Sequence, residues 1–281
     1  MRSILVTGAD GFIGQNLIRA FSPCDFEVKA IDKKHGDISL KDTWDRLPPS
    51  DVLVHLAGKS NVPASWEAPS VFIQTNCLGT SNALEYCRKH RAKLIFLSSY
   101  MYGDAGSEPI TETVATLSKN PYALTKQFSE QLCEIYNHNF NLDIRILRPF
   151  NVFGPGQNKT FLIPKIIFEA LTSGKVQVKD LEPRRDYIYV DDITAAIIKL
   201  IDYSGSSRIF NIGTGYSHSV MDVIETVQDI LGKKIDVIND NERRPGEIMD
   251  SVANIELARR EIGWVPKYTF RQGLSQMIER L

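Results

Sequence analysis

The run Ile4-Leu5-Val6-Thr7-Gly8-Ala9-Asp10-Gly11-Phe12-Ile13-Gly14 decides the fold. Its apolar start is typical of a buried parallel strand, and the residues after Gly11 follow a helical pattern. Gly8 permits a sharp turn, Gly11 leaves room for a pyrophosphate, and Gly14 lets the helix pack closely on the sheet. Free N–H groups at the helix N-terminus favour phosphate. The spacing is G-x-x-G-x-x-G rather than G-x-G-x-x-G, so the run alone also fits a turn that binds no ligand.

Composition excludes several classes of protein. The chain has 281 residues, 43% of them hydrophobic and 24% charged, which suits one or two globular domains. A net charge of −1 gives no electrostatic reason to bind nucleic acid or an anionic membrane. No apolar run reaches the roughly 20 residues of a membrane span, and none at the N-terminus resembles a signal peptide. We therefore expect a cytoplasmic protein. No metal site is expected, because the four cysteines lack metal-binding spacing: Cys24, Cys77, Cys87 and Cys133.

The second predicted strand, Glu27 to Ile31, ends in an acid, Asp32. A carboxylate at this place accepts hydrogen bonds from the adenosine ribose and repels a 2′-phosphate. This predicts NAD in preference to NADP, although Lys33 and Lys34 weaken the preference. The run Gly36-Asp37-Ile38 follows after a short link and is expected to pass the adenine.

A third buried strand runs from Asp51 to Leu56 and leads into the small residues Ala57-Gly58, which let the backbone approach a cofactor. We expect His55 to be packed rather than catalytic, because it lies within an apolar strand. A long helix is predicted over Val71–His90. Asn76 interrupts its pattern, and such a polar residue usually faces solvent or a neighbouring carbonyl.

A fourth strand, Lys93 to Leu97, ends in Ser98, and this end of an open α/β sheet faces the ligand crevice. The helix that begins at Asn120-Pro121 then places Tyr122 and Lys126 one turn apart on one face. A nearby ammonium lowers the pKa of a phenol from about 10, so that it exchanges a proton with a sugar hydroxyl or carbonyl oxygen. Ser98 could donate a second hydrogen bond to that oxygen. A Y-x-x-x-K pair is common in helices, so its weight comes from this context.

The second half of the chain has a looser pattern. Leu142–Leu147 is predicted to be the last core strand, and Gly154-Pro155-Gly156 breaks the chain after it. Short helices are predicted over 161–171, from 191, over 221–231 and over 255–262, and short strands over 176–178 and 235–238. The predicted fold is α/β, a Rossmann-type doubly wound parallel sheet with a small α+β substrate-binding cap. Residues 1–150 are mainly the dinucleotide-binding domain, and 151–281 are mainly the cap, with some segments returning to the core.

The ordered motifs resemble the extended short-chain dehydrogenase/reductase superfamily, in particular its nucleotide-sugar epimerase/dehydratase/reductase branch. The resemblance covers essentially the whole chain. The segments that carry it are Thr7 to Gly14, Asp32, Gly36-Asp37, His55 to Gly58, Asn76 with Gly79-Thr80, Ser98 to Gly103, Tyr122 to Lys126, Arg148 to Asn151, Arg185 to Asp192, Asn211 to Gly215, and Arg244 to Glu247.

The resemblance implies roles for these residues. Tyr122 would be the general acid/base, Lys126 would tune it and hold the nicotinamide ribose, and Ser98 would bind the reacting oxygen. A one-residue shift would give that last role to Ser99. The implied NAD(P) contacts are Gly8, Gly11, Phe12, Ile13, Gly14, Asp32, Asp37, Ile38, Leu56, Ala57, Gly58, Asn76, Tyr122, Lys126 and Pro149. The implied contacts to a nucleotide sugar are Ser98, Ser99, Tyr100, Asn151, Arg185 and Arg244.

Arg185 and Arg244 are expected to bind the substrate pyrophosphate, since a guanidinium fork suits phosphate. The alternative for each is a surface salt bridge. Their neighbours Arg184 and Arg243 are expected to be solvated. Asn151 is expected to bind the phosphates as well.

Three reactions share this scaffold. A 4,6-dehydratase needs an acid and a base near C6, and its relatives carry carboxylic acids where this chain has Ser99 and Tyr100, which makes dehydration the weaker reading. The short link from Asp32 to Asp37 favours an exchanging cofactor, and hence a reductase of a nucleotide-linked 4-keto-6-deoxyhexose. The alternatives are an NAD-dependent 4-epimerase and a non-catalytic NAD(P) sensor. Family members often form homodimers through two helices of each copy that make a four-helix bundle. Here those helices would be about Val71–His90 and Tyr122–Phe140, whose apolar residues could equally belong to the core.

Overall fold

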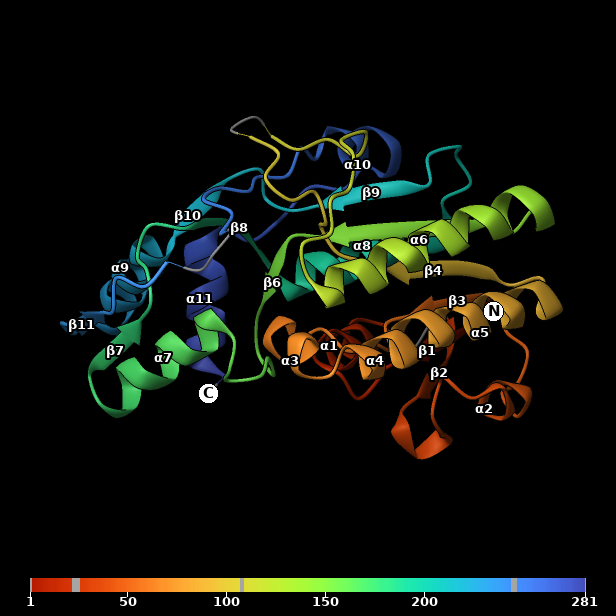
Figure 1. Cartoon of the computed structure of the whole chain (residues 1–281), viewed down its shortest axis with the longest axis horizontal. Helices are drawn as coiled ribbons and strands as arrows, with labels where there is room; N and C mark the ends of the chain where they lie inside the picture. The colour runs from red at the N-terminus through yellow and green to blue at the C-terminus, as the bar shows by residue number, and fades with distance from the viewer. Residues whose placement is uncertain (1, 22–25, 107–108, 244–246, 281) are drawn as a thin grey trace.

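A six-stranded parallel sheet forms the centre of the protein in a computed structural model that describes residues 2–21, 26–106, 109–243 and 247–280 (Figure 1). The strand order is β2-β1-β3-β4-β5-β9, so the chain reverses direction across the sheet beside β1. This confirms the predicted doubly wound α/β fold, whose ligand crevice lies at the carboxyl ends of the strands. The strands are β1 (Arg2–Thr7), β2 (Phe26–Ile31), β3 (Val52–His55), β4 (Lys93–Leu97), β5 (Ile144–Pro149) and β9 (Ile209–Ile212).

The prediction that Leu142–Leu147 is the last core strand is wrong. β9 pairs in parallel with β5, with Leu147 opposite Phe210. The segment returns to the core because its alternate residues are fully buried against the helix α8 (Val190–Asp202). A four-residue strand so far along the chain has no local pattern that reveals its partner.

Helices cover both faces of the sheet, and the strands supply side chains to both. In β1, Ile4 and Val6 join one apolar cluster while Leu5 joins the other. This alternation follows from the two-residue repeat of a strand. The first face packs against α1 (Phe12–Ala20), α8 and α10 (Glu256–Ile262). The second packs against α2 (Lys41–Asp45), α5 (Gly79–His90) and α6 (Pro121–Phe140).

The long helix predicted over Val71–His90 is present but is not regular. It consists of α4 (Pro69–Phe72), a π-helical segment η2 (Ile73–Leu78) and α5. Asn76 lies within the π-helical segment and is buried at 2% exposure. π-Helical turns are frequent at functional sites, and this one carries a polar side chain inward.

The cap has a separate apolar cluster and lies beside the sheet, at the left of Figure 1. Its predicted helices and strands are confirmed to within one residue at each bound. Strands β6 and β8 supply side chains to both clusters, so they join cap and sheet. The cap elements are β6 (Asn151–Phe153), β7 (Lys175–Val178), β8 (Arg184–Tyr189), β10 (Ser217–Ser219), β11 (Asp236–Asn239), α7 (Leu162–Thr172), α9 (Val220–Leu231) and α11 (Phe270–Glu279).

Candidate active site

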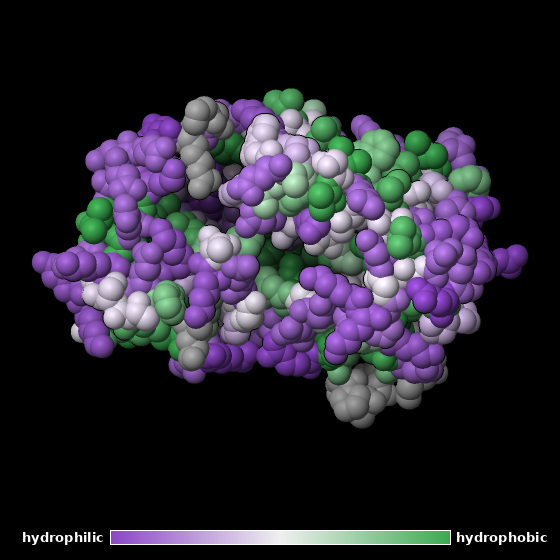
Figure 2. Space-filling model, turned by 60° about the horizontal axis from the view of Figure 1, so that its bottom comes forward, coloured by the Kyte–Doolittle hydropathy of each residue, from purple (hydrophilic) through white to green (hydrophobic). Residues whose placement is uncertain are grey.

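A cleft of about 1020 Å³ lies between the carboxyl ends of the strands and the cap. Figure 2 shows a hollow in the surface with hydrophobic residues on its floor and hydrophilic residues around much of its rim. The cleft is lined by the glycine turn with the start of α1, by residues of the segment 56–64 after β3, and by the ends of β4 and β5 with the start of α6. From the cap side it is lined mainly by residues of the segments 157–165, 178–187, 242–243 and 247–248. The cleft therefore brings together residues that are more than a hundred positions apart in the sequence.

The glycine turn has the geometry that a pyrophosphate needs. Gly8 has a φ of 71°, and a Cβ there would lie 2.7 Å from the Ala57 nitrogen. A Cβ on Gly14 would lie 2.1 Å from the Gly8 oxygen, so only glycine allows α1 to pack this closely. Within the described residues, no side chain caps the first turn of α1 after Gly11. Its N–H groups and its positive dipole end therefore face the cleft, and they fit the phosphates of a dinucleotide.

Asp32 and Asp37 are not among the residues that line the described cleft. The Asp32 carboxylate caps the short helix η1 (Lys33–His35): its Oδ1 accepts from the Lys34 nitrogen at 2.9 Å and pairs with His35 Nδ1 at 2.9 Å. The backbone hydrogen bond from Lys34 lowers the pKa of Asp32, so the carboxylate is ionised. Asp37 caps the following turn by accepting from the Ser39 nitrogen at 2.8 Å.

Ile38, Ala57 and Asn76 are likewise outside the described cleft lining. The Asn76 side chain accepts from the Lys59 nitrogen at 2.8 Å and donates to the Lys59 oxygen at 3.0 Å. It also donates to Thr125 Oγ1 at 2.9 Å, which ties the turn after β3 to α6. Of the two expected orientations, toward solvent or toward a neighbouring carbonyl, Asn76 has the second.

His55 is packed as predicted. It is 1% exposed, and its Nδ1 is 2.8 Å from Thr7 Oγ1. Burial lowers the pKa of His55 to about 3, so the ring is neutral.

Tyr122 and Lys126 both line the cleft from the first turns of α6. The helix begins cleanly there because Asn120 Oδ1 accepts from the Ala123 nitrogen at 2.8 Å and Pro121 occupies the first turn. Lys126 is 7% exposed, and its Nζ donates to the Leu97 oxygen at 2.7 Å, at the end of β4. This bond fixes the ammonium at the wall of the cleft.

The expectation that Lys126 lowers the pKa of Tyr122 is not met. Burial raises the pKa of Tyr122, and a hydrogen bond with Ser99 only partly opposes the effect. Burial also lowers the pKa of Lys126, to about 8, against the opposing charge of Glu130. The phenol is therefore neutral at neutral pH, and Lys126 loses its proton only slightly above neutral pH.

Ser98 and Ser99 both line the cleft beside Tyr122. Ser98 is 3% exposed, and its Oγ has no hydrogen-bond partner among the described residues. A buried hydroxyl without a partner is costly, so a ligand oxygen in the cleft would complete its hydrogen bonding. The geometry thus leaves Ser98 free for a ligand, whereas Ser99 interacts with the phenol of Tyr122.

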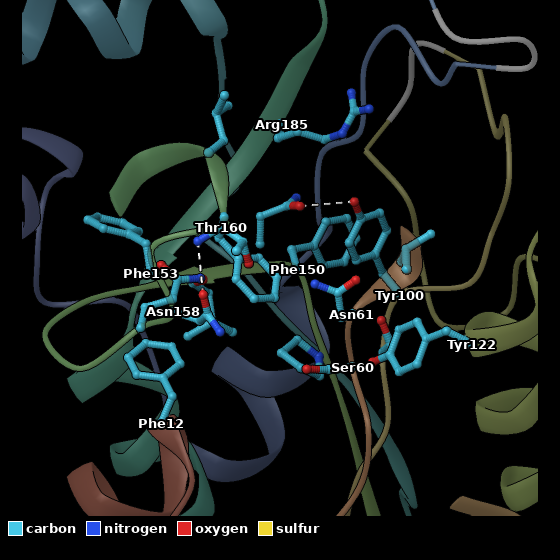
Figure 3. Close-up of a pocket in the computed structure, with 18 of the residues that line it drawn as sticks. Phe12, Ser60, Asn61, Tyr100, Tyr122, Phe150, Phe153, Asn158, Thr160 and Arg185 are labelled. Carbon is cyan, nitrogen blue, oxygen red and sulfur yellow. Dashed lines mark hydrogen bonds between the residues drawn. The ribbon is translucent and has the colours of Figure 1, made fainter. Parts of the chain in front are cut away.

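Tyr100 and Asn151 line the cleft together with Arg185, which Figure 3 shows at the upper part of the view. Arg185 Nη1 donates to the Ile248 oxygen at 2.6 Å, and its Nη2 pairs with Glu247. The guanidinium is therefore held in place at the cleft wall. Arg244 lies outside the described residues.

The neighbouring arginines are solvated as expected, with the side chains of Arg184 and Arg243 42% and 52% exposed, and each also forms an ion pair. Arg184 Nη1 is 3.2 Å from Asp222 Oδ2, and Arg243 Nε is 2.9 Å from Asp180 Oδ2. Both pairs lie in the cap and hold its segments together.

Most of the expected contacts thus meet in one cleft, namely Gly8, Gly11, Phe12, Ile13, Gly14, Leu56, Gly58, Ser98, Ser99, Tyr100, Tyr122, Lys126, Pro149, Asn151 and Arg185. The sequence reasoning missed other polar residues that line it: Ser60, Asn61, Gln157, Asn158, Thr160, Lys165, Lys179 and Glu247. Glu247 stands in the same motif as Arg244 and could have been noticed. The segment 157–165 follows the Gly154-Pro155-Gly156 break and carries no signal of its own.

Comparison with known proteins gives the family. Residues 4–213 match the model of the NAD dependent epimerase/dehydratase family. The chain belongs to this family. It is similar to the GDP-6-deoxy-D-mannose reductase of Pseudomonas aeruginosa, with 28% identity over 98% of this chain and 95% of that protein.

Two solved structures extend the comparison. One is RMD from Pseudomonas aeruginosa complexed with NADPH, with a TM-score of 0.91, 26% identity and coverage of 100% of this chain and 98% of that one. The other is UDP-glucose 4-epimerase from Thermus thermophilus with NAD, with a TM-score of 0.90, 28% identity and coverage of 99% and 98%. These similarities confirm the expected NAD(P)-dependent enzyme of the short-chain dehydrogenase/reductase type. They do not distinguish reduction from epimerisation, since both activities occur among the similar proteins.

Two further observations concern the described part of the chain. Its helices include none that is both long and apolar enough to cross a membrane. Its His, Cys, Asp and Glu side chains form no group that could hold a metal ion.

Proposed function

We propose that this protein reduces the 4-keto group of a nucleotide-linked 6-deoxyhexose. The observation that carries the proposal is the set formed by Ser98, Tyr122 and Lys126 at one end of the cleft, next to Ser99 and Tyr100 rather than carboxylic acids. A dehydratase would need an acid and a base close to the reacting sugar, and these two side chains are a hydroxyl and a phenol.

The ionisation of Tyr122 favours reduction. A reductase must give a proton to the oxygen that a carbonyl becomes, and burial raises the pKa of Tyr122 and keeps the phenol protonated. The bound nicotinamide would supply the hydride. Ser98, whose hydroxyl has no partner among the described residues, donates a hydrogen bond to the same oxygen. Lys126, one turn after Tyr122 in α6, adds a positive charge to the same cleft.

We propose NADH as the preferred cofactor. The ionised Asp32 carboxylate stands at the end of β2, and its Oδ2 remains available to the ribose while Oδ1 caps η1. Lys33 and Lys34 follow in η1 and reduce the penalty for a 2′-phosphate. NADPH should therefore be used less well than NADH rather than excluded.

Epimerisation is the second candidate, because the chain is as similar to UDP-glucose 4-epimerases as to the reductase. An epimerase keeps its cofactor through oxidation and re-reduction, so it interconverts UDP-sugars without added NAD(P)H. The test is to strip the purified protein of nucleotide and assay it with a panel of nucleotide-linked 4-keto sugars and NADH or NADPH. Consumption of NAD(P)H supports reduction, and interconversion of UDP-glucose and UDP-galactose without added NAD(P)H would refute it.

A homodimer is proposed as the assembly. Leu124, Phe128 and Ile135 lie on one face of α6 and are 57%, 46% and 52% exposed. Ile73 and Leu78, in the adjoining segment η2, are 51% and 50% exposed. A second copy would cover this apolar face. Light scattering with size-exclusion chromatography should give twice the chain mass, and Phe128→Glu should shift it towards the monomer.

A further inference from the structure

Tyr100 lines the cleft, and the proposed reaction gives this side chain no chemical step. Its ring stacks on Phe150, with centroids 4.8 Å apart and planes inclined by 11°. Its hydroxyl donates to Asn151 Oδ1 at 3.1 Å. In Figure 3 the Tyr100 hydroxyl points toward the side of the cleft where Arg185 lies, while the Tyr122 hydroxyl lies on the other side. Tyr100 therefore stands between the reacting end of the cleft and the end that would hold the pyrophosphate.

The orientation of the Asn151 amide is fixed by its second contact. Asn151 Nδ2 donates to the backbone oxygen of Asp186 at 3.2 Å. That oxygen is held in place because the Asp186 carboxylate accepts from the nitrogens of Thr214 at 2.8 Å and Gly215 at 2.9 Å. If the amide were reversed, Asn151 Oδ1 would face the Asp186 oxygen, and two acceptors would meet. Asn151 must therefore present its oxygen to Tyr100.

This arrangement determines what Tyr100 offers to a ligand. A phenol has one proton and two lone pairs, and the proton of Tyr100 is committed to Asn151. Only lone pairs remain for the cleft, so Tyr100 accepts hydrogen bonds and does not donate them. A phosphate oxygen is an acceptor as well and cannot satisfy this group. In a nucleotide sugar, the donors between the reacting carbon and the pyrophosphate are the hydroxyl groups of the sugar ring.

We propose that the Tyr100 oxygen accepts a hydrogen bond from a ring hydroxyl of the substrate sugar, and that Tyr100 thereby selects sugars that carry this hydroxyl. The inference rests on the proposed function, because it assumes that a nucleotide sugar lies in the cleft. Tyr100 is a specificity-determining residue in this account, while Asn151 positions its proton. The stacked Phe150 ring keeps the phenol in place before the ligand arrives.

The test compares the wild type with Tyr100→Phe, which keeps the stacked ring and removes only the hydroxyl. Dissociation constants are measured calorimetrically for UDP-glucose and GDP-mannose and for the bare diphosphates UDP and GDP. We expect the variant to bind whichever sugar nucleotide the wild type binds about threefold to tenfold more weakly, the range for one neutral hydrogen bond. Binding of the matching bare diphosphate and of NADH should be unchanged. In turnover, KM for the sugar nucleotide should rise while kcat stays nearly constant.

Tyr216→Phe is the matched control, since Tyr216 is 75% exposed and lies outside the described cleft lining. Equal binding of the sugar nucleotide by wild type and Tyr100→Phe would overturn the inference. So would an equal loss for the bare diphosphate, because the effect would then come from the phosphate site. If the wild type binds no nucleotide sugar and turns over none of the nucleotide-linked 4-keto sugars of the panel, the proposed function fails as well. If Tyr122→Phe abolishes turnover while Tyr100→Phe behaves as wild type, only this inference fails.

Discussion

The buried ion pair between Glu130 and Arg148 joins the helix that carries Tyr122 to the strand β5, and Glu130→Gln tests its importance. Arg148 Nε lies 3.0 Å and 3.2 Å from the two Glu130 oxygens, and Nη2 lies 2.5 Å from Oε2. The side chains are 9% and 6% exposed for Glu130 and Arg148. The substitution keeps the shape of the side chain but leaves a buried guanidinium without a counter-charge.

The expected loss of stability follows from this geometry. Two unit charges about 3 Å apart attract by roughly 5 kcal/mol at an effective dielectric constant of about 20. Breaking a buried pair on one side typically costs about 3–5 kcal/mol, and the retained hydrogen bond to the amide oxygen places the expected loss at the lower end. For a chain of this size that corresponds to a fall in Tm of roughly 5–10 °C. Urea unfolding followed by circular dichroism measures the free energy directly.

The control is Asp45→Asn, which removes an ion pair of similar length at the surface. Lys41 Nζ is 2.7 Å from Asp45 Oδ2, with side chains 79% and 44% exposed. Such a pair should contribute less than about 1 kcal/mol. A loss for Glu130→Gln no larger than that of the control would refute the reasoning. A double variant, Glu130→Gln with Arg148→Met, should be more stable than Glu130→Gln alone, because it no longer buries an unpaired charge. A double variant that is less stable than Glu130→Gln would also contradict the expectation.

Three further predictions concern titration and backbone geometry. Burial lowers the pKa of His55 to about 3, so between pH 6.5 and 3 the unfolded chain binds a proton at His55 that the folded chain does not. As the pH falls through this range, the free energy of unfolding of the wild type should therefore decrease more steeply than that of His55→Gln, by up to about 1.4 kcal/mol per pH unit. Parallel slopes of the two proteins in urea titrations would contradict this. Because burial lowers the pKa of Lys126 to about 8, kcat/KM should decline as pH rises through that value, whereas a profile flat to pH 10 would show that this ammonium is not needed. Gly14→Ala should abolish NADH binding in fluorescence titrations, because its Cβ would lie 2.1 Å from the Gly8 oxygen, and wild-type affinity would exclude the proposed turn geometry.

The sheet was predictable from the sequence because its strands are short apolar runs. Ile4 to Val6 and Val52 to Val54 have side chains buried on both faces, and such runs have few alternatives to a parallel strand. β9 was missed as part of this sheet, because its four residues look like any short buried segment. What places it there is its pairing with β5, some sixty residues earlier in the chain.

The site was predictable where one short motif supplies both position and chemistry, as Tyr122 and Lys126 do on one turn of α6. The direction of the pKa shift of Tyr122 was not predictable, since it depends on burial by the folded chain rather than on Lys126, one turn later in the helix. The partner of Arg185 is Glu247, about sixty residues away, and no local pattern links them. The hydrogen bond from Tyr100 to Asn151 likewise joins the loop after β4 to the start of β6, some fifty residues later.

The most direct test of the central claim is a steady-state assay of the nucleotide-free protein and its Tyr122→Phe variant with a nucleotide-linked 4-keto-6-deoxyhexose and NADH, followed at 340 nm. We expect the wild type to oxidise NADH stoichiometrically with the sugar. In the variant, kcat should decrease by a factor on the order of 10²–10⁴, because the proton donor is lost. A fully active Tyr122→Phe variant, or sugar interconversion by the wild type without net oxidation of NADH, would contradict this expectation.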